Sequence, residues 1–351
     1  MSLERLRSGY RDFAEHEAAG RSPLYAELAA GVADDDELLA WLDRLPVGKR
    51  QPNLMFAAAR VAGGEIGGFG ELRSLLSKRR DEVEALLLAR RTQTNEAARC
   101  ATLLPLLAAL PQPLALLEVG ASAGLCLLPD RYAYEYEVEP RAGRGGGDPA
   151  AAERGDDPAE PGAGAGDPAP PRILRLGTGA PLLRCRVSGP APLPTAIPRI
   201  AWRAGLDLAP VDLGDPQQVA WLEALVWPGE GDRLQTLRAA IAVAREDPPR
   251  VVQGDLTKDL PALAAEAPPD TTLVVFHTAV LAYVPRKGRA AFRRAVDSLD
   301  AVWIANEAPR ILGVDPATVA PSLFVLARDG EPLAHTDGHG SFLTWLGDAG
   351  A

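Results

Sequence analysis

The chain has 351 residues, 47% of them hydrophobic and 24% charged, which are ordinary values for a globular protein. Its net charge of -10 argues against nucleic acid as the main partner, because neutralising phosphates requires clustered Lys and Arg. There is no apolar run of the ~18 residues that a membrane span needs and no apolar signal segment near the start, and three cysteines without C-x-x-C spacing fit a reducing cytoplasm and argue against zinc.

Residues 1–110 show apolar positions at spacings of three and four, as in Leu72, Leu75 and Leu76, and no convincing strand. We therefore predict a helical N-terminal cap over 1–110. Near its end, RRTQTNE (90–96) holds an unusual polar cluster. Thr92 or Gln93 could cap a helix, with Glu96 closing a capping box. Alternatively, Gln93, Asn95 and Glu96 could hold the polar groups of a cofactor or substrate, which is the interpretation we favour.

The stretch LLEVGASAGL (116–125) ends an apolar run with Glu118 and continues as a loop of small residues. This loop spells G-x-S-x-G, the nucleophile elbow of serine hydrolases. Its small residues are equally suited to a strand-to-helix turn that lets a ligand approach the backbone. Turns of this kind also occur purely for packing.

Residues 130–197 form a predicted insertion of β type. Tyr132, Tyr134 and Tyr136 alternate as in a strand, and RILRLGTGAPLLRCRV follows later in the chain. Between these pieces, residues 140–171 have almost no large apolar side chain, so we expect a disordered loop there. An antiparallel insertion with a mobile tip is the simplest interpretation.

From residue 197 onward, strand-like and helix-like segments alternate. RIAWRAGLDLAPVD predicts a strand ending at Asp207, and RVVQGDL a short strand closing on Asp255. TTLVVFHTAVLAYV and AVWIANEAP read as buried strands, and RKGRAAFRRAVDSL as an amphipathic helix. A closing hairpin turns at Asp329-Gly330. Such alternation predicts a doubly wound, mainly parallel sheet.

A serine hydrolase would use Ser122 as nucleophile, Asp255 or Asp270 as acid, and His335 or His339 as base. However, LALLEV would be the first strand of the sheet, whereas a hydrolase elbow follows several strands. An upstream oxyanion motif such as H-G-G-G is also missing. A cofactor loop explains more of the sequence, because ligands of doubly wound sheets bind outside the carboxyl ends of the strands.

Several landmarks resemble class I S-adenosylmethionine-dependent methyltransferases: EVGASAG for E-x-G-x-G-x-G, then GLDLAP, QGDLTKDLP and VVFHTAVLAYVP at successive strand ends. The resemblance implies that Asp207 binds the ribose hydroxyls and that Asp255 with Leu256 flanks the adenine. Glu135, Glu137 and Glu139 are better spaced for the ribose, but they lack the surrounding motif. The resemblance also implies that the methionine part lies against Glu118, Gly120, Ala121, Ser122 and Gly124, where Ser122 replaces the middle glycine.

More closely, the chain resembles a bacterial family catalogued as domain of unknown function 2332. The segments that carry this resemblance are RRTQTNEAARCATLLP, EVGASAGLCLLPDRY, RAGLDLAPVDLGDP and VVFHTAVLAYVP. The family is thought to share the methyltransferase fold, and it implies no particular substrate.

Methyl transfer from a sulfonium depends mainly on positioning, and a base is needed only when the acceptor loses a proton. His277 closes a predicted strand and could serve as that base, or it could be a histidine satisfied at a strand end. Tyr283 could orient an acceptor, or it could simply pack beside Leu281 and Val284. Glu307 could face the same cleft, or it could be a surface carboxylate. His335 and His339 lie in a glycine-rich turn, HTDGHG, so we expect a surface loop rather than a metal site.

The sequence therefore predicts an α/β protein with a Rossmann-like methyltransferase core over 111–351, the helical cap, and the insertion. We expect a cytoplasmic S-adenosylmethionine-dependent enzyme that acts on a small molecule. It needs no metal, nucleic acid or membrane. A serine hydrolase and a non-catalytic nucleotide- or metabolite-binding protein are the alternatives.

Overall fold

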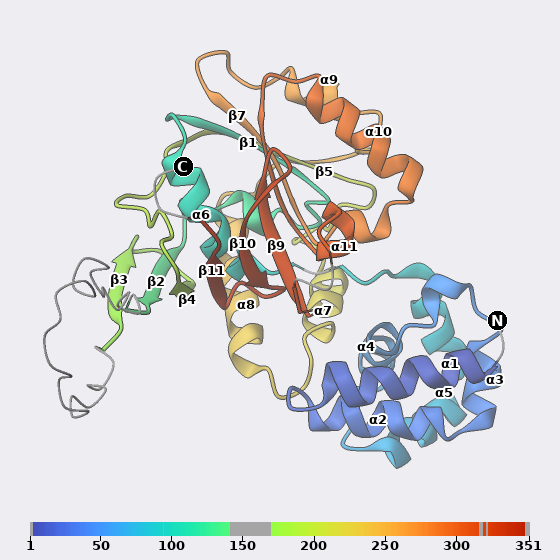
Figure 1. The fold of residues 1–351 in the computed structure, drawn as a ribbon. Coiled ribbons are helices and arrows are strands. Elements are labelled where there is room, and N and C mark those ends of the chain that lie inside the picture. The colour runs from blue at the N-terminus through green and yellow to red at the C-terminus, as the bar shows by residue number, and fades with distance from the viewer. Residues whose placement is uncertain (1–2, 94, 141–169, 316–318, 321, 348–351) are drawn as a thin grey trace, which may run out of the picture. The chain divides into compact units, whose positions relative to one another are not determined.

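Figure 1 shows the computed structural model of the chain, which describes residues 3–93, 95–140, 170–315, 319–320 and 322–347. Nearly all of the disorder expected for 140–171 falls on 141–169, outside the described residues. Within the described residues, no helix is long and apolar enough to cross a bilayer.

Helices occupy much of the described chain before residue 110 and recur between the later strands. The α-helices are α1 (Leu3–Asp12), α2 (Pro23–Ala33), α3 (Asp36–Leu42), α4 (Pro52–Gly63), α5 (Phe69–Ala89), α6 (Cys100–Ala109), α7 (Pro216–Ala224), α8 (Gly231–Glu246), α9 (Leu260–Ala264), α10 (Arg286–Asp297) and α11 (Pro309–Leu312).

The described strands form an eleven-stranded mixed sheet in the order β3-β2-β4-β11-β10-β9-β8-β7-β1-β5-β6. This mixed sheet with helices confirms the predicted α/β class. The strands are β1 (Leu114–Val119), β2 (Ala133–Val138), β3 (Arg172–Leu176), β4 (Leu182–Ser188), β5 (Ile200–Asp207), β6 (Val251–Gln253), β7 (Thr272–Thr278), β8 (Val302–Glu307), β9 (Leu323–Arg328), β10 (Glu331–Asp337) and β11 (Phe342–Trp345).

The chain divides into two compact units. The first unit comprises Met1–Ala97, Leu117–Leu128 and Arg203–Leu263, and the second comprises Ala98–Leu116, Pro129–Trp202 and Ala264–Ala351. The first unit therefore combines α1 to α5 with the end of β1, most of β5, and the segment that carries α7, α8 and β6.

Local sequence fixes where the helices of the first unit begin. Ser22 Oγ accepts the N–H of Tyr25 at the start of α2, and Asp35 Oδ1 accepts that of Leu38 at the start of α3. Both contacts satisfy an amide that the first helical turn leaves unpaired. Pro23 and Pro52 open α2 and α4, where the missing N–H costs nothing.

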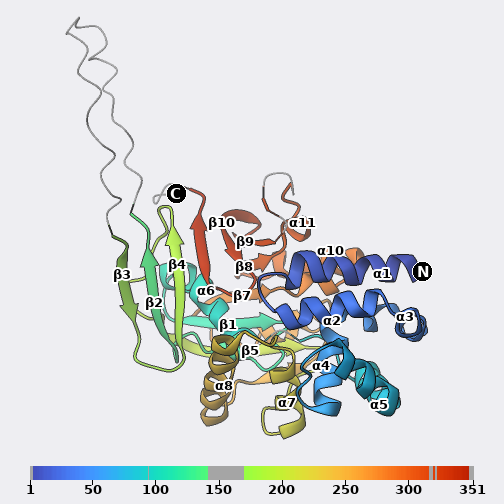
Figure 2. The ribbon, with the colours of Figure 1, turned by 90° about the horizontal axis from the view of Figure 1, so that it is seen from below.

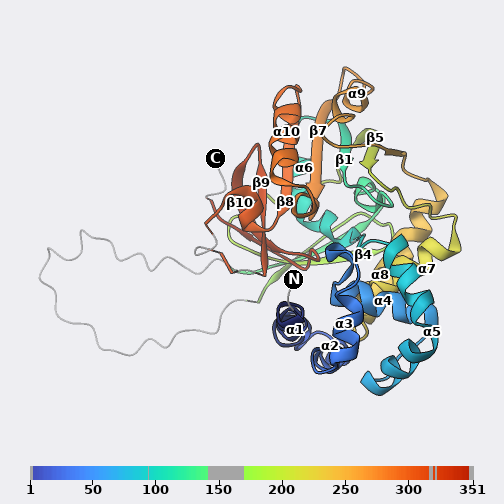
Figure 3. The ribbon, with the colours of Figure 1, turned by 90° about the vertical axis from the view of Figure 1, so that its right-hand side faces the viewer.

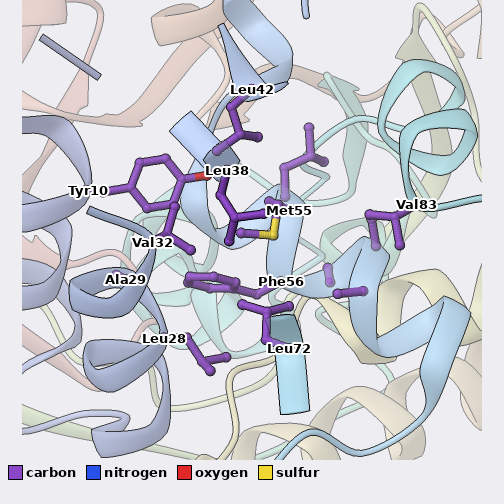
Figure 4. Packing of buried hydrophobic residues seen from close by; sticks show 14 of the residues in the cluster. Tyr10, Leu28, Ala29, Val32, Leu38, Leu42, Met55, Phe56, Leu72 and Val83 are labelled. Atoms are coloured by element: carbon purple, nitrogen blue, oxygen red, sulfur yellow. The ribbon is translucent and has the colours of Figure 1, made fainter. Parts of the chain in front are cut away.

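A shared apolar core holds these helices together. Figure 4 shows Met55 and Phe56 of α4 among labelled side chains from α1, α2, α3 and α5. The Phe56 ring lies 4.9 Å from that of Tyr25 and 6.4 Å from that of Tyr10, between centroids. Trp221 and Ala224 of α7 join the same core, so the helical segment and the later α7 pack as one body.

In the second unit, β7 and β8 pair in parallel, while β8, β9, β10 and β11 follow one another antiparallel. Figure 3 shows α10 alongside β7 and β8. Between these elements, the Phe292 ring of α10 contacts the rings of His277 and Trp303. Asp329 and Gly330 turn from β9 to β10 with φ values of 54° and 89°, which confirms the predicted hairpin turn.

The insertion supplies β2, β3 and β4, which Figure 2 shows side by side. β2 and β3 are antiparallel, as expected, but β4 pairs in parallel with both β2 and β11. Tyr134 and Tyr136 of β2 are fully buried, with hydroxyls bonded to the carbonyls of Pro129 and Ala101. The insertion thus adds strands to the sheet, and the buried tyrosines of β2 anchor it.

The capping alternative for Thr92 or Gln93 and one local expectation are wrong. Thr92 and Gln93 cap no helix: α5 ends at Ala89, and the N-cap of α6 is Arg99, which makes no side-chain cap bond. Their side chains bond to Gln51 Oε1 and Ala209 O instead. His335 does not lie in a loop, because it pairs within β10 against Val325 and Thr344. Only His339 belongs to the turn that follows.

Candidate functional site

The loop after β1 adopts an unusual backbone. Gly120, Ser122 and Gly124 have φ values of 71°, 52° and 72°. Glycine enters this left-handed region freely, but serine does so at a cost of about 1–2 kcal/mol. At Gly124 a side chain is also excluded by packing, since a Cβ there would lie 2.7 Å from Cγ of Pro249. The loop is thus a tightly specified bend rather than a loose connection.

Two side chains from other parts of the first unit hold this bend. Asp207 Oδ2 accepts the N–H of Ser122 at 2.8 Å. Asn95 Oδ1 accepts the N–H of Ala123 at 2.9 Å, and Asn95 Nδ2 donates to Ser122 Oγ at 2.8 Å. These bonds explain how Ser122 can be kept at positive φ. They also mean that the amides of Ser122 and Ala123 already have protein acceptors.

The small size of Ala121 follows from packing. A Cβ added to Gly205 of β5 would lie 2.5 Å from the Cβ of Ala121, so strand and bend are in close contact. Ala121, Ser122 and Ala123 are all buried. The backbone N–H groups of Gly120 and Ala121 also donate to Leu206 O, which joins the bend to β5. The bend therefore offers a ligand mainly its half-buried first residue, Gly120.

Asp207 is the half-exposed carboxylate beside this bend. It ends β5, as predicted, and its Oδ1 accepts the N–H of Ala209 at 2.8 Å. A carboxylate has about four lone-pair sites, so two remain after the bonds from Ser122 and Ala209. These two sites could accept hydroxyl groups.

Asp255 follows β6 and carries its own local bonds. Its Oδ1 accepts both the N–H and the hydroxyl of Thr257, each at 2.7 Å. These two bonds hold the pKa of Asp255 below its ordinary value. The neighbouring Leu256 is half-buried. Gly254 N bonds to Asp207 O at 2.9 Å, which joins this turn to the end of β5.

The polar cluster of 90–96 has divided roles in the first unit. Gln93 and Asn95 contact the segments after β5 and β1, as described above. Glu96, in contrast, forms an ion pair with Arg233 of α8 at 2.9 Å, and Arg233 also pairs with Glu230. Glu118 is buried at the end of β1. Asn95 is therefore the member of the cluster that touches the bend directly.

In the second unit, His277 and Glu307 are neighbours at the ends of β7 and β8. His277 Nδ1 lies 2.8 Å from Glu307 Oε1, and Trp303 Nε1 donates to His277 Nε2 at 3.0 Å. The imidazole is therefore the neutral tautomer with its proton on Nδ1. His277 is fully buried, and both of its ring nitrogens have protein partners.

Tyr283 lies in the second unit and is 63% exposed. Partial burial and the negative charge of Glu307 raise its pKa, whereas the positive charge of Arg99 lowers it. Three residues that contact this region were not identified from the sequence. Arg99 donates to Thr278 at the end of β7, and Trp303 donates to His277. The signal for Arg99 was present, because a lone arginine precedes the otherwise apolar helix CATLLPLLAA.

Other features do not add to these sites. A cavity of about 290 Å³ in the second unit lies between α6 and residues 192–198, and no predicted site residue lines it. Among the described residues, no group of three or more His, Cys, Asp or Glu side chains is placed to hold a metal ion.

One of three comparisons with known proteins gives a match. A family model described as "Uncharacterized protein conserved in bacteria (DUF2332)" matches residues 7–63 and 62–345. No curated protein and no solved structure matches the chain. Because the family model covers nearly the whole sequence, the chain belongs to the DUF2332 family of bacterial proteins.

Proposed function

We propose that the chain is an S-adenosylmethionine-binding, methyltransferase-like enzyme that acts on a small molecule. The observation that carries the proposal is the bond from Ser122 N to Asp207 Oδ2. It joins the bend after β1 to a carboxylate at the end of β5, and β1 and β5 are neighbours in the sheet. Nucleotide ligands of Rossmann-like sheets bind outside such strand ends, with an acid on the ribose.

The donors and acceptors of the first unit fit an adenosyl group. Asp207 keeps lone pairs for two ribose hydroxyls, and Asp255 keeps its Oδ2 for the amino group of adenine beside Leu256. Gly120 would lie nearest the methionine part. The side chains of Gln93 and Asn95, rather than the amides of the bend, would bind its polar end. The cofactor would supply an electrophilic methyl group carried on sulfur.

The residues of the second unit are assigned by chemistry. Glu307, held by His277, is the carboxylate suited to accept a proton or bind an acceptor molecule. Tyr283 would orient that molecule. His277 could act as a base itself only after losing its bond to Trp303 or Glu307. Methyl transfer relies mainly on positioning, so binding and orienting the acceptor is the chief task assigned to these groups.

The serine hydrolase alternative makes a different prediction for Ser122. A nucleophilic hydroxyl must donate to a general base, whereas Ser122 Oγ accepts from the Asn95 amide and is 5% exposed. A fluorophosphonate probe decides between the two. Covalent labelling of Ser122, absent in Ser122→Ala, would support the hydrolase and count against the methyltransferase.

Calorimetric titration of the full chain with S-adenosylhomocysteine tests the proposal. We expect saturable binding and at least about a tenfold loss in Asp207→Asn, since a bond to a charged acceptor contributes about 1.5–3 kcal/mol. Asp212→Asn is the matched control, because Asp212 is also in the first unit and caps only Gly214. Asp255→Asn gives a second, independent contact should Asp207→Asn fold poorly. Absence of binding by the folded wild-type chain, or equal affinities in all four proteins, contradicts the assigned site. Binding without turnover on any acceptor would support the non-catalytic alternative.

A further inference from the structure

Arg99 is a buried cation with an incomplete set of partners. It is 3% exposed, and its Nε donates to Gly338 O at 2.8 Å. Its Nη1 donates to Thr278 O at 3.1 Å and to Thr278 Oγ1 at 3.2 Å. Within the described residues no carboxylate pairs with it. Burying a guanidinium without an anion is unusual, because neutral acceptors offset little of the lost hydration of the charge.

One amino group of Arg99 remains available. The guanidinium also lies over the Phe324 ring, with Cζ 5.9 Å from the ring centroid. The bonds to Gly338 and Thr278 use Nε and Nη1, so Nη2 has no hydrogen-bond partner in the part of the chain that the structure describes. Nη2 is also not among the fully buried unpaired atoms, which means that it keeps some contact with solvent. An amino nitrogen of this kind offers two N–H donors to an oxyanion.

Glu307 provides a complementary acceptor. Its Oε1 accepts bonds from His277 Nδ1 at 2.8 Å, Val280 N at 2.7 Å and Leu281 N at 2.9 Å. Its Oε2 is buried and has no partner among the described residues. A buried carboxylate oxygen without a donor is costly, so Oε2 is suited to a donor that a ligand brings.

The two charged groups hold the same short segment. Arg99 binds Thr278 at the end of β7, and Glu307 binds Val280 and Leu281 just beyond it. Both charges also act on the hydroxyl of Tyr283 in the following turn. A cation with free donors and an anion with a free acceptor therefore lie close together, beside an exposed aromatic ring.

We propose that Arg99 and Glu307 form a binding site for a small molecule that carries a carboxylate next to a hydroxyl or ammonium group. The carboxylate lies on Nη2 of Arg99, and the neighbouring donor bonds to Oε2 of Glu307. A phosphate dianion fits less well, because the carboxylate of Glu307 repels it. The site shares Glu307 and Tyr283 with the acceptor-binding role proposed above, so it rests on the proposed function and names the chemical class of the acceptor. Because the site lies wholly in the second unit, its binding is measured without S-adenosylmethionine, and its failure is distinguishable from a failure of cofactor binding.

The tyrosines offer a direct readout. Of the six in the chain, Tyr10, Tyr25, Tyr132, Tyr134 and Tyr136 are buried, and Tyr283 is exposed. The full chain labelled with fluorotyrosine is titrated with glycolate, glycine, acetate, glycolamide and inorganic phosphate, and fluorine NMR follows the Tyr283 signal, assigned with Tyr283→Phe. We expect saturable shifts with glycolate and glycine, at least about tenfold weaker binding of acetate, and none of glycolamide.

Variants assign the two contacts. Arg99→Gln should abolish the response to glycolate, and Glu307→Gln should weaken glycine more than glycolate, because only glycine loses a charge pair. Arg184→Gln, an exposed arginine of the same unit, should behave as wild type. If Arg99→Gln fails to fold by circular dichroism, Arg99→Lys keeps the charge and should retain weaker binding. No saturable shift in the wild type, an unchanged shift in Arg99→Gln, or phosphate binding as tightly as glycolate overturns the proposal.

Discussion

Replacing Asn95 with alanine is the most direct test of how the bend after β1 is held. The substitution removes the acceptor of the Ala123 N–H and the donor to Ser122 Oγ, at 2.9 and 2.8 Å. Ser122 and Ala123 are only 5% and 3% exposed. Water therefore replaces these partners poorly, and the N–H of Ala123 is left buried without an acceptor.

The magnitude follows from these contacts. A buried, unpaired amide costs about 1–3 kcal/mol, and the bond to Ser122 contributes about 0.5–1.5 kcal/mol. The serine hydroxyl can rotate toward another acceptor, so its share belongs at the lower end. We expect Asn95→Ala to lower the free energy of unfolding of the first unit by about 1.5–3.5 kcal/mol. Asn95→Asp should cost less than half of that, because it keeps an acceptor for Ala123 and Ser122 can donate to it.

Urea unfolding followed by tryptophan fluorescence measures this loss. Trp221 Nε1 donates to Arg91 O at 3.0 Å, so its emission reports on the segment that carries Asn95. The two units need not unfold together, so the unfolding transition of the first unit is fitted separately. Asn53→Ala is the matched control, since Asn53 Oδ1 accepts only the N–H of the next residue. If Asn95→Ala falls within about 0.5 kcal/mol of this control, the bend is not held by Asn95 and the reasoning is refuted.

Two further predictions concern packing and pH. Gly205→Ala should destabilise the first unit by about 1–3 kcal/mol, because its Cβ would collide with that of Ala121. Adding Ala121→Gly to the same chain should restore part of this loss. If the effects of the two substitutions on urea unfolding simply add, the contact is contradicted. Burial raises the pKa of Cys185 to about 12 from an ordinary 9.0, so the unfolded thiol ionises first and stability should fall as pH rises between these values, by about 1.4 kcal/mol per pH unit. Cys185→Ala should reduce the fall between pH 9 and 10, to which the buried tyrosines Tyr10, Tyr134 and Tyr136 also contribute. An unchanged slope there would show that this thiol is not one of its sources.

Much of the fold could be predicted because local patterns mark the strand ends. Apolar runs that stop at a polar residue placed the end of β5 at Asp207 and that of β8 at Glu307. The Asp-Gly pair marked the β9–β10 turn, because few other residues adopt the positive φ angles that such a turn requires. These signals depend on a few neighbouring residues, and tertiary contacts did not override them.

The remaining features depend on contacts between distant segments. No local pattern shows that β4 pairs in parallel with β11, which lies more than a hundred residues later. Residues 92, 93 and 95 bond to Gln51, Ala209 and Ser122, which lie far away in the sequence, so the capping alternative read from neighbouring residues is not realised there. In the candidate site, the sequence indicated Glu307 and His277 but not the hydrogen bond between them. It also did not indicate Arg99, which donates to Thr278 at the end of β7.

The position of β11 constrains the order in which the second unit can be completed during synthesis. This strand lies between β4 and β10, yet the ribosome makes it after every other strand of the sheet. Until it emerges, β4 and β10 each have an unsatisfied edge, and exposed edges are where nascent chains associate wrongly. A nascent or prematurely terminated chain lacking 342–345 should therefore depend on chaperones more than the first unit does, since the first unit is fully synthesised some eighty residues earlier.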